Sequence, residues 1–135
     1  MKDKKILVVE DDEHLNKLIS YNLIVRGFNP DSAFDGFEAK EKISREVFDV
    51  IILDVMLPGI DGFTICRAIK ENPVISKTCV IILTARAQPL DKIYSEVIGA
   101  DYYFTKPFNM LELMEIIKNK SLYDKNKNKD IYAYY

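Results

Sequence analysis

The sequence predicts an α/β fold in which a parallel five-stranded β-sheet is covered by helices on both faces. Two observations support this fold class. Five short apolar segments alternate along the chain with segments of helical periodicity, in the order βαβαβαβαβα. The central segments, residues 49–54 and 79–84, are apolar almost throughout, which is typical of parallel strands that are buried on both faces.

Elements in the first half of the chain follow from the spacing of apolar residues and from turn residues. The first helix carries Leu15, Leu18 and Ile19 on one face at helical spacing. Gly27 is suited to end this helix. Pro30 cannot donate a hydrogen bond to a neighbouring strand, which places the second strand at a sheet edge. In order, the predicted elements are a strand at residues 5–10, a helix at 13–26, a strand at 28–34, a helix at 36–47 and a strand at 49–54.

The second half of the chain repeats the same alternation. A loop rich in turn residues, residues 57–62, precedes the third helix. Pro89 occupies a favourable first-turn position of the fourth helix, and Asn109 is suited to cap the last one. In order, the predicted elements are a helix at residues 63–70, a strand at 79–84, a helix at 89–98, a strand at 101–105 and a helix at 109–120.

A single domain over residues 1–120, followed by a tail or truncated linker over residues 121–135, fits the 135-residue chain. The net charge of −2 gives no general attraction to nucleic acid or to an anionic membrane. No apolar run approaches the roughly 20 residues that span a bilayer. The sequence therefore predicts a cytoplasmic domain that binds neither nucleic acid nor a membrane directly. Cys66 and Cys79 form no CxxC motif and are expected to be small buried residues.

Polar residues gather at the carboxyl ends of the predicted strands. Acidic residues 10–12 end the first strand, Asp54 ends the third, Thr84 ends the fourth and Lys106 follows the fifth. Ligands of open parallel sheets bind beyond these strand ends, where the strand order reverses. The fold would therefore bring residues that are distant in sequence to one rim of the sheet.

The residue types at this rim indicate phosphoryl transfer. Asp11, Asp54 and a neighbouring acid would repel one another unless a pKa rises or a cation binds between them. Oxygen ligands without histidine or cysteine select a hard ion such as Mg²⁺. Lys106 and Thr84 would complete a cradle for a tetrahedral anion, and a carboxylate can act as the nucleophile. We therefore expect Asp54 to accept a phosphoryl group beside a bound divalent cation.

Each of these residues also has an ordinary structural explanation when it is taken alone. Acids favour helix N-termini, a lysine is commonly solvated, and a threonine suits a strand. The combination at one rim is what favours a functional site. Whether the Lys106–Pro107 bond is cis, which would turn the chain sharply toward the site, stays open at this point.

Four segments carry a resemblance to a known family. They are KILVVEDD (residues 5–12), DVIILDVMLPGIDGF (49–63), VIILTA (80–85) and GADYYFTKPF (99–108). With these segments in this order, the sequence resembles the receiver domain of bacterial two-component response regulators over about residues 4–120. The resemblance implies a flavodoxin-like, doubly wound (βα)5 fold with strand order 2-1-3-4-5. It also implies a histidine kinase or phosphotransfer protein as donor, an output domain or protein as target, and a phosphorylated switch rather than an enzyme with a separate substrate.

The same resemblance assigns roles to the acidic residues. Asp54 corresponds to the phosphorylated residue. Asp11 corresponds to a direct ligand of Mg²⁺, for which Mn²⁺ would substitute, and Glu10 to a ligand that acts through water. Met56 corresponds to the residue whose backbone carbonyl binds the metal. Glu10, Asp11 and Asp12 all follow Val9, and the register of KILVVED favours Glu10 and Asp11, rather than Asp12, as the pair.

The resemblance also implies a switch. Thr84 corresponds to the residue whose hydroxyl bonds the phosphoryl group. Lys106 corresponds to the lysine of the family's site, and the Lys106–Pro107 bond would be cis. Tyr103 corresponds to an aromatic side chain that turns inward when Thr84 moves, which changes the face formed by helix 4, strand 5 and helix 5. The ordinary alternative for Tyr103 is a half-buried tyrosine on an edge strand, with a solvated hydroxyl.

Three positions qualify the resemblance. Tyr102 stands where the winged-helix subclass often has a second aspartate, and Ile116 stands where a basic residue is common. Both differences argue against the symmetric dimer of that subclass. Arg86, two residues after Thr84, is placed to affect water access and therefore the lifetime of the phosphoryl group, in a direction that the sequence does not give.

Three other functions fit the sequence less well. A dinucleotide-binding domain would need a glycine-rich turn where this chain has acids after the first strand. A phosphatase with an aspartyl nucleophile would typically carry an acid at the position of Met56. A receiver-like module that has lost phosphotransfer would normally lack one of the site residues, and none is missing.

Overall fold

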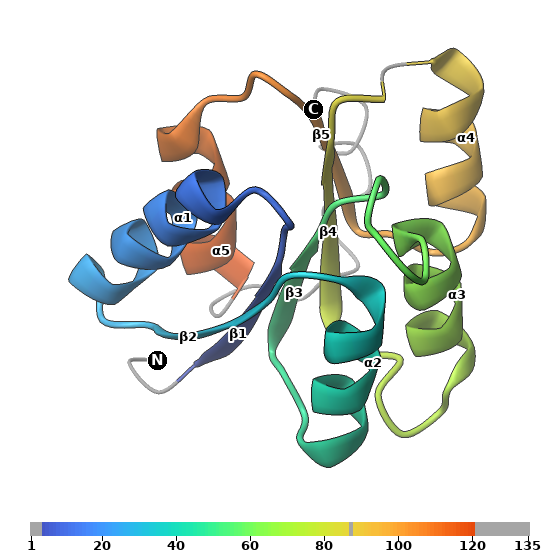
Figure 1. Ribbon diagram of the computed structural model, residues 1–135, viewed down its shortest axis with the longest axis horizontal. Coiled ribbons are helices and arrows are strands. Elements are labelled where there is room, and N and C mark those ends of the chain that lie inside the picture. The colour runs from blue at the N-terminus through green and yellow to red at the C-terminus, as the bar shows by residue number, and fades with distance from the viewer. Residues whose placement is uncertain (1–3, 87, 121–135) are drawn as a thin grey trace.

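Five parallel strands form the sheet of the computed structural model, which describes residues 4–86 and 88–120 (Figure 1). Their order is β2-β1-β3-β4-β5, so the predicted order is confirmed. All four neighbouring pairs are parallel, as a doubly wound α/β fold requires. The strands are β1 (Lys5–Val9), β2 (Asn29–Ala33), β3 (Val50–Leu53), β4 (Cys79–Thr84) and β5 (Tyr102–Thr105).

Helices cover both faces of this sheet. In Figure 1, α1 and α5 lie together on one side of the strands, whereas α2, α3 and α4 lie on the other. Acidic N-caps begin the first three helices, and Asn109 Oδ1 accepts a hydrogen bond from Glu112 N at 3.1 Å, as expected of a cap. The helices are α1 (Glu13–Val25), α2 (Gly36–Arg45), α3 (Gly62–Glu71), α4 (Pro89–Val97) and α5 (Met110–Lys120).

Side chains alternate between two apolar cores, one on each side of the sheet. On β1, Leu7 and Val9 belong to the core beneath α2 and α3, whereas Ile6 and Val8 belong to the core beneath α1 and α5. Because both faces are covered, the central strands have no solvated side, which explains their continuous apolar sequence. Cys66 and Cys79 are buried in these cores, as predicted.

One predicted helix face needs correction. Leu18 was expected on the apolar side of α1, but 51% of its surface is exposed. The buried residues of this helix are Asn16, Ile19 and Leu23, because the face toward the sheet is centred on these positions. A polar residue therefore occupies a core-facing position that the apolar pattern did not identify.

No helix among the described residues is long and apolar enough to cross a membrane. The predicted cytoplasmic location stays a prediction. The expected tail at residues 121–135 lies outside the described residues.

Candidate functional site

The candidate site lies at the rim where the carboxyl ends of the strands meet. Val9 pairs with Leu53 in the ladder between β1 and β3, so the next residues, Glu10 and Asp54, lie side by side. Backbone hydrogen bonds continue the ladder into the site, because Asp54 N donates to the carbonyl of Val9 at 3.0 Å. The predicted convergence of these strand ends is therefore confirmed by the sheet register.

Three acids form a compact cluster at this rim. Glu10, Asp11 and Asp54 each offer a carboxylate oxygen, and these oxygens lie within 4.8 Å of one another. Glu10 and Asp54 are buried, with 2% and 4% of their surfaces exposed, whereas Asp11 is exposed to solvent. A set of carboxylate oxygens without histidine or cysteine fits a hard divalent cation.

Asp12 has a different position from its two acidic neighbours. Its Oδ1 accepts hydrogen bonds from the backbone N–H groups of His14 and Leu15, at 3.0 and 3.2 Å. It is therefore the N-cap of α1. This geometry separates Asp12 from the cluster and agrees with the register that favours Glu10 and Asp11.

Lys106 supplies the positive charge of the rim. Its Nζ donates to Glu10 Oε1 at 2.7 Å and to Asp54 Oδ2 at 2.9 Å. Lys106 pairs with two of the three clustered carboxylates, and when all three are ionised the cluster keeps an excess of two negative charges, which a divalent cation would neutralise. The Lys106–Pro107 bond that follows is cis, in agreement with the expectation.

Burial and charge shift the pKa values of this pair in identifiable ways. Burial raises the pKa of Glu10 above its usual range, and the hydrogen bond from Lys106 opposes that rise. Burial alone would lower the pKa of Lys106, but its hydrogen bonds to Asp54 and Glu10 outweigh this effect and raise it. Lys106 therefore keeps its positive charge at neutral pH.

The loop after β3 fixes the orientation of Asp54. Met56 N donates to Asp54 Oδ1 at 3.0 Å, so the two oxygens of this carboxylate have separate partners, Met56 and Lys106. Gly62 begins α3 directly against this loop, and a Cβ atom at Gly62 would lie 2.2 Å from the carbonyl oxygen of Asp54. Only glycine permits that approach. The sequence alone does not show this requirement, because it depends on how the start of α3 lies against Asp54.

A buried asparagine supports the first strand at the point where it enters the site. Asn16 Nδ2 donates to the carbonyls of Val8 and Glu10, at 3.2 and 3.0 Å. These hydrogen bonds tie α1 to the end of β1, next to the acidic cluster. Sequence reasoning missed Asn16, although an asparagine among core-facing positions of an amphipathic helix is a signal that could have identified it.

The two predicted switch residues both contact the backbone of Arg86. Thr84 is fully buried, and its Oγ1 accepts a hydrogen bond from Arg86 N at 3.2 Å. Tyr103 is 1% exposed, and its hydroxyl donates to the carbonyl of Arg86 at 2.6 Å. The alternative of a half-buried tyrosine with a solvated hydroxyl is therefore wrong. Burial also raises the pKa of Tyr103, as does the negative charge of Asp91, while Arg86 opposes the rise.

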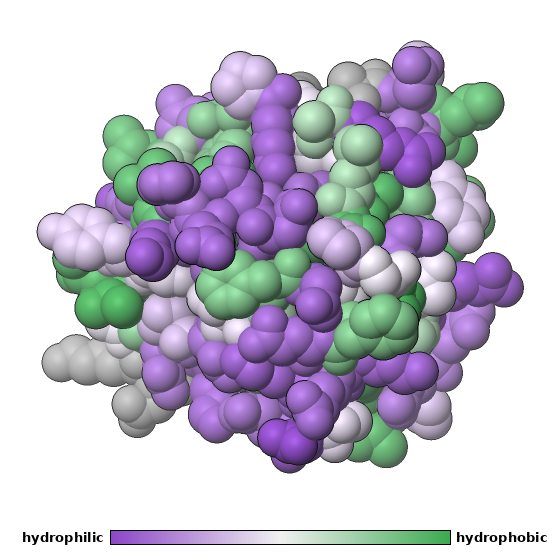
Figure 2. All heavy atoms as spheres, in the orientation of Figure 1, coloured by the Kyte–Doolittle hydropathy of each residue, from purple (hydrophilic) through white to green (hydrophobic). Residues whose placement is uncertain are grey.

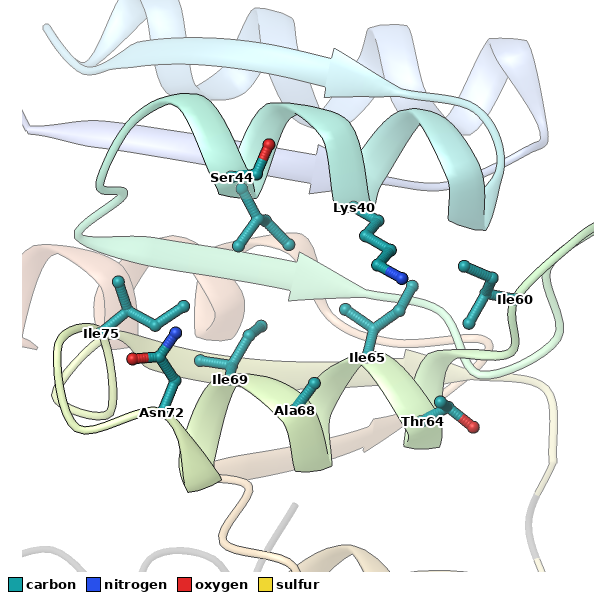
Figure 3. A pocket seen from close by; sticks show the side chains of 10 residues that line it. Lys40, Ser44, Ile60, Thr64, Ile65, Ala68, Ile69, Asn72 and Ile75 are labelled. Carbon is teal, nitrogen blue, oxygen red and sulfur yellow. The ribbon is translucent and has the colours of Figure 1, made fainter.

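A separate groove of about 470 Å³ lies between α2 and α3. Lys40 and Ser44 face it from α2, and Ile65 and Ile69 face it from α3 (Figure 3). Its lining is mostly apolar and shares no residue with the acidic cluster. The groove therefore lies apart from the chemistry of the rim.

Comparison with known proteins finds a protein family that matches this chain. The family model of the response regulator receiver domain matches residues 6–118. The phosphate regulon transcriptional regulatory protein PhoB of Rhizobium meliloti is 40% identical over 114 residues, which cover 84% of this chain and 50% of that protein. The alkaline phosphatase synthesis transcriptional regulatory protein PhoP of Bacillus subtilis is 40% identical over 116 residues, which cover 86% and 48%. The chain thus spans about half the length of these curated relatives.

Solved structures agree with the same fold. The receiver domain of the Francisella response regulator 1452 superposes with a TM-score of 0.81 at 33% identity, covering 87% of this chain and 96% of that one. The chemotaxis response regulator CheY4 of Vibrio cholerae superposes with a TM-score of 0.80 at 30% identity, covering 87% and 98%. Similarity therefore extends over nearly the whole of both domains.

Proposed function

This chain belongs to the response regulator receiver domain family, whose general function is to accept a phosphoryl group in two-component signalling, and on that premise we propose that Asp54 is the acceptor. The observation that carries the proposal is the environment of its carboxylate. Asp54 is buried at the end of β3, one oxygen accepts the Met56 N–H, and the other accepts the Lys106 ammonium. These contacts hold a carboxylate in one orientation at the rim, as a nucleophile requires.

The transfer would convert Asp54 into an acyl phosphate. An oxygen of Asp54 attacks the phosphorus of a phosphohistidine on a partner kinase or phosphotransfer protein. The new P–O bond forms as the P–N bond breaks, and the leaving imidazole nitrogen takes up a proton from solvent water. Lys106, which already lies 2.9 Å from Asp54 Oδ2, would contact an oxygen of the incoming phosphoryl group. The Thr84 hydroxyl would donate to another.

Glu10, Asp11 and Asp54 would hold a Mg²⁺ ion, together with the backbone carbonyl of Met56, and Mn²⁺ would substitute for it. The clustered carboxylate oxygens and their excess of negative charge support this assignment. When bound, the ion would neutralise charge on the oxygens of the transferred group. Glu10 is buried and hydrogen-bonded to Lys106, so its contribution would pass through a water molecule, whereas Asp11 would bind directly.

We propose that the domain is a switch rather than an enzyme with a separate substrate, and that it spans residues 1–120. Its chemistry would be limited to its own phosphorylation and dephosphorylation. Met56 supports this limit, because it stands where an aspartyl phosphatase would place a second acid. A histidine kinase or phosphotransfer protein would supply the phosphoryl group, and an output domain or protein would respond to it.

The face formed by α4, β5 and α5 is the proposed output surface. Leu90, Ile93 and Val97 are exposed along α4, and Figure 2 shows apolar side chains at the upper right of the molecule, where α4 lies. Tyr102 and Ile116, which were expected to weaken a symmetric dimer through this face, are only 3% and 7% exposed. They pack in the core, so neither places a charge on this face, and the expectation about that dimer stays a prediction.

Phosphorylation of the intact chain tests the proposed function. Incubation with acetyl phosphate and Mg²⁺ is expected to add the mass of one phosphoryl group, and the gain should disappear in Asp54→Asn or when the metal is chelated. Arg45→Met is a matched control, because Arg45 forms an exposed ion pair with Glu41 on α2 and shares no hydrogen bond or ion pair with the rim residues in the described part of the chain. No gain in the unmodified chain, or a gain that survives Asp54→Asn, would contradict the proposal.

A further inference from the structure

Arg86 connects both switch residues through its backbone. Its N–H donates to Thr84 Oγ1 at 3.2 Å, and its carbonyl accepts the hydroxyl proton of Tyr103 at 2.6 Å. A threonine hydroxyl has one donor and two acceptor lone pairs. The Arg86 N–H occupies a lone pair and leaves the Thr84 O–H available to an incoming oxygen. The placement of one peptide segment thus orients two buried hydroxyl groups.

The side chain of Arg86 is held by the first turn of α4. Its Nε donates to Asp91 Oδ2 at 3.2 Å, and its Nη2 donates to Asp91 Oδ1 at 2.6 Å. A two-point contact between guanidinium and carboxylate fixes direction as well as distance. Asp91 is buried, and its charge is favoured at a helix N-terminus whose N-cap, Gln88, makes no side-chain cap hydrogen bond.

A second contact joins Arg86 to the start of α3. The guanidinium carbon lies 5.5 Å from the centroid of the Phe63 ring, within the range of a cation–π interaction. The same ring packs edge-on against Tyr94 of α4, with centroids 5.1 Å apart. Phe63 directly follows Gly62, the residue that approaches the backbone of Asp54. Arg86 therefore lies where α4 and β5 meet the loop between β3 and α3.

From these contacts we propose that Arg86 and Asp91 are positioning residues, which hold the Thr84 hydroxyl ready for the phosphoryl group and keep Tyr103 inside. The proposal rests on the proposed acceptance of phosphate by Asp54. Neither side chain touches the acidic cluster in the described part of the chain, so both would act through the Arg86 backbone. If the ion pair is broken, Thr84 loses its orienting donor and Tyr103 loses its buried acceptor.

The rate of phosphoryl incorporation tests the route through Thr84. With acetyl phosphate at fixed Mg²⁺, Asp91→Asn and Thr84→Ala are each expected to slow incorporation on the order of tenfold, a modest effect of the size seen for coupled residues. The double variant should be no slower than Thr84→Ala, because the ion pair acts on the hydroxyl that this variant lacks. Arg86→Gln should match Asp91→Asn. An unchanged rate in Asp91→Asn, or effects that multiply in the double variant, would overturn the proposal.

A spectroscopic measurement tests the route through Tyr103 without any phosphorylation. Fluorotyrosine incorporated throughout the chain gives a ¹⁹F signal for Tyr103 that is identified by its loss in Tyr103→Phe. In folded Asp91→Asn and Arg86→Gln, this signal should move toward that of a solvent-exposed tyrosine, whereas Arg45→Met, which breaks an exposed ion pair on α2, should leave it in place. A buried signal in both variants would refute the positioning role. Failure of the unmodified chain to accept phosphate would instead refute the proposed function and leave this measurement standing.

Discussion

At the scale of single residues, Glu10 and Asp54 depend on one ammonium group. Lys106 is their shared cationic partner among the described residues, and both carboxylates are buried. Lys106→Met is expected to lower the free energy of unfolding by about 3 kcal/mol at neutral pH without metal, because it leaves buried charges unpaired. Chemical denaturation measures this loss. Lys17→Met, at an exposed position of α1, should change stability by less than about 0.5 kcal/mol.

The loss of unfolding free energy in Lys106→Met should depend on pH, and its direction follows from Glu10. Burial raises the pKa of Glu10 in the folded state, so its protonated form favours folding. That contribution is present below the ordinary pKa of 4.5 and is lost as the pH rises through the folded value. Loss of the ammonium raises the folded pKa further. The deficit of Lys106→Met should therefore be full at pH 7 and shrink as the pH falls toward 4.5, and a deficit independent of pH would contradict this account.

Cys66 gives a second expectation at this scale. Burial raises the pKa of its thiol to about 12, and the reactive form of cysteine is the thiolate. A thiol reagent at pH 8 should therefore leave Cys66 unmodified in the folded chain, and both cysteines should react once the chain is unfolded in urea. Rapid modification of Cys66 without denaturant would show that the core beneath α2 and α3 opens readily.

Individual site residues were predictable to different degrees. Asp54, Glu10, Asp11 and Lys106 follow buried strands in the sequence, and a parallel sheet must bring such positions to one rim. The hydrogen bonds of Asn16 depend instead on how α1 crosses the sheet, which the apolar pattern does not specify. The roles proposed for these residues stay predictions.

At the scale of secondary-structure elements, an ion pair joins α3 to the start of β5. Lys70 Nζ lies 2.8 Å from Asp101 Oδ2, and the same oxygen accepts the Val80 N–H of β4 at 2.8 Å. Lys70 also donates to the carbonyls of Ser76 and Thr78. One partly buried carboxylate thus connects a helix and two neighbouring strands.

Asp101→Ala is therefore expected to be strongly destabilising. It leaves the Val80 N–H and the Lys70 ammonium without this acceptor, and the free energy of unfolding should fall by about 2–3 kcal/mol. The matched control is Glu71→Ala, which breaks the exposed pair with Arg67 and should cost less than about 1 kcal/mol. Similar losses in both variants would contradict the structural role of Asp101.

Element boundaries were predictable because local chemistry sets them. Both ends of β4 match the prediction, as do the starts of β1, α1, α2 and α4 and the ends of β5 and α5, and the other boundaries differ by one or two residues. The surroundings of β5 were harder to predict. Tyr102 and Ile116 are buried because α5 covers β5, an arrangement that follows from the packing of helices on the sheet rather than from either residue.

At the scale of the whole molecule, a bound cation should stabilise the fold. Mg²⁺ at 100 times its dissociation constant would add about 2.7 kcal/mol to the free energy of unfolding, because it binds the folded rim and not the unfolded chain. Thermal denaturation with and without MgCl₂ measures the effect. Asp11→Asn should reduce the shift, whereas Asp12→Asn should retain it, since asparagine preserves the N-cap of α1. The reverse pattern would place the metal at Asp12.

One particular carboxylate at the rim, that of Asp54, is the proposed acceptor. The strand ends meet at this rim (Figure 1), and the carboxylates of Glu10, Asp11 and Asp54 cluster there. Borohydride reduction of the phosphorylated chain converts an aspartyl phosphate into homoserine, which peptide mass spectrometry locates. We expect homoserine at position 54 and at no other aspartate. Homoserine at Asp11 or Asp12, or at none of the aspartates of a chain that has gained phosphate, would contradict the account.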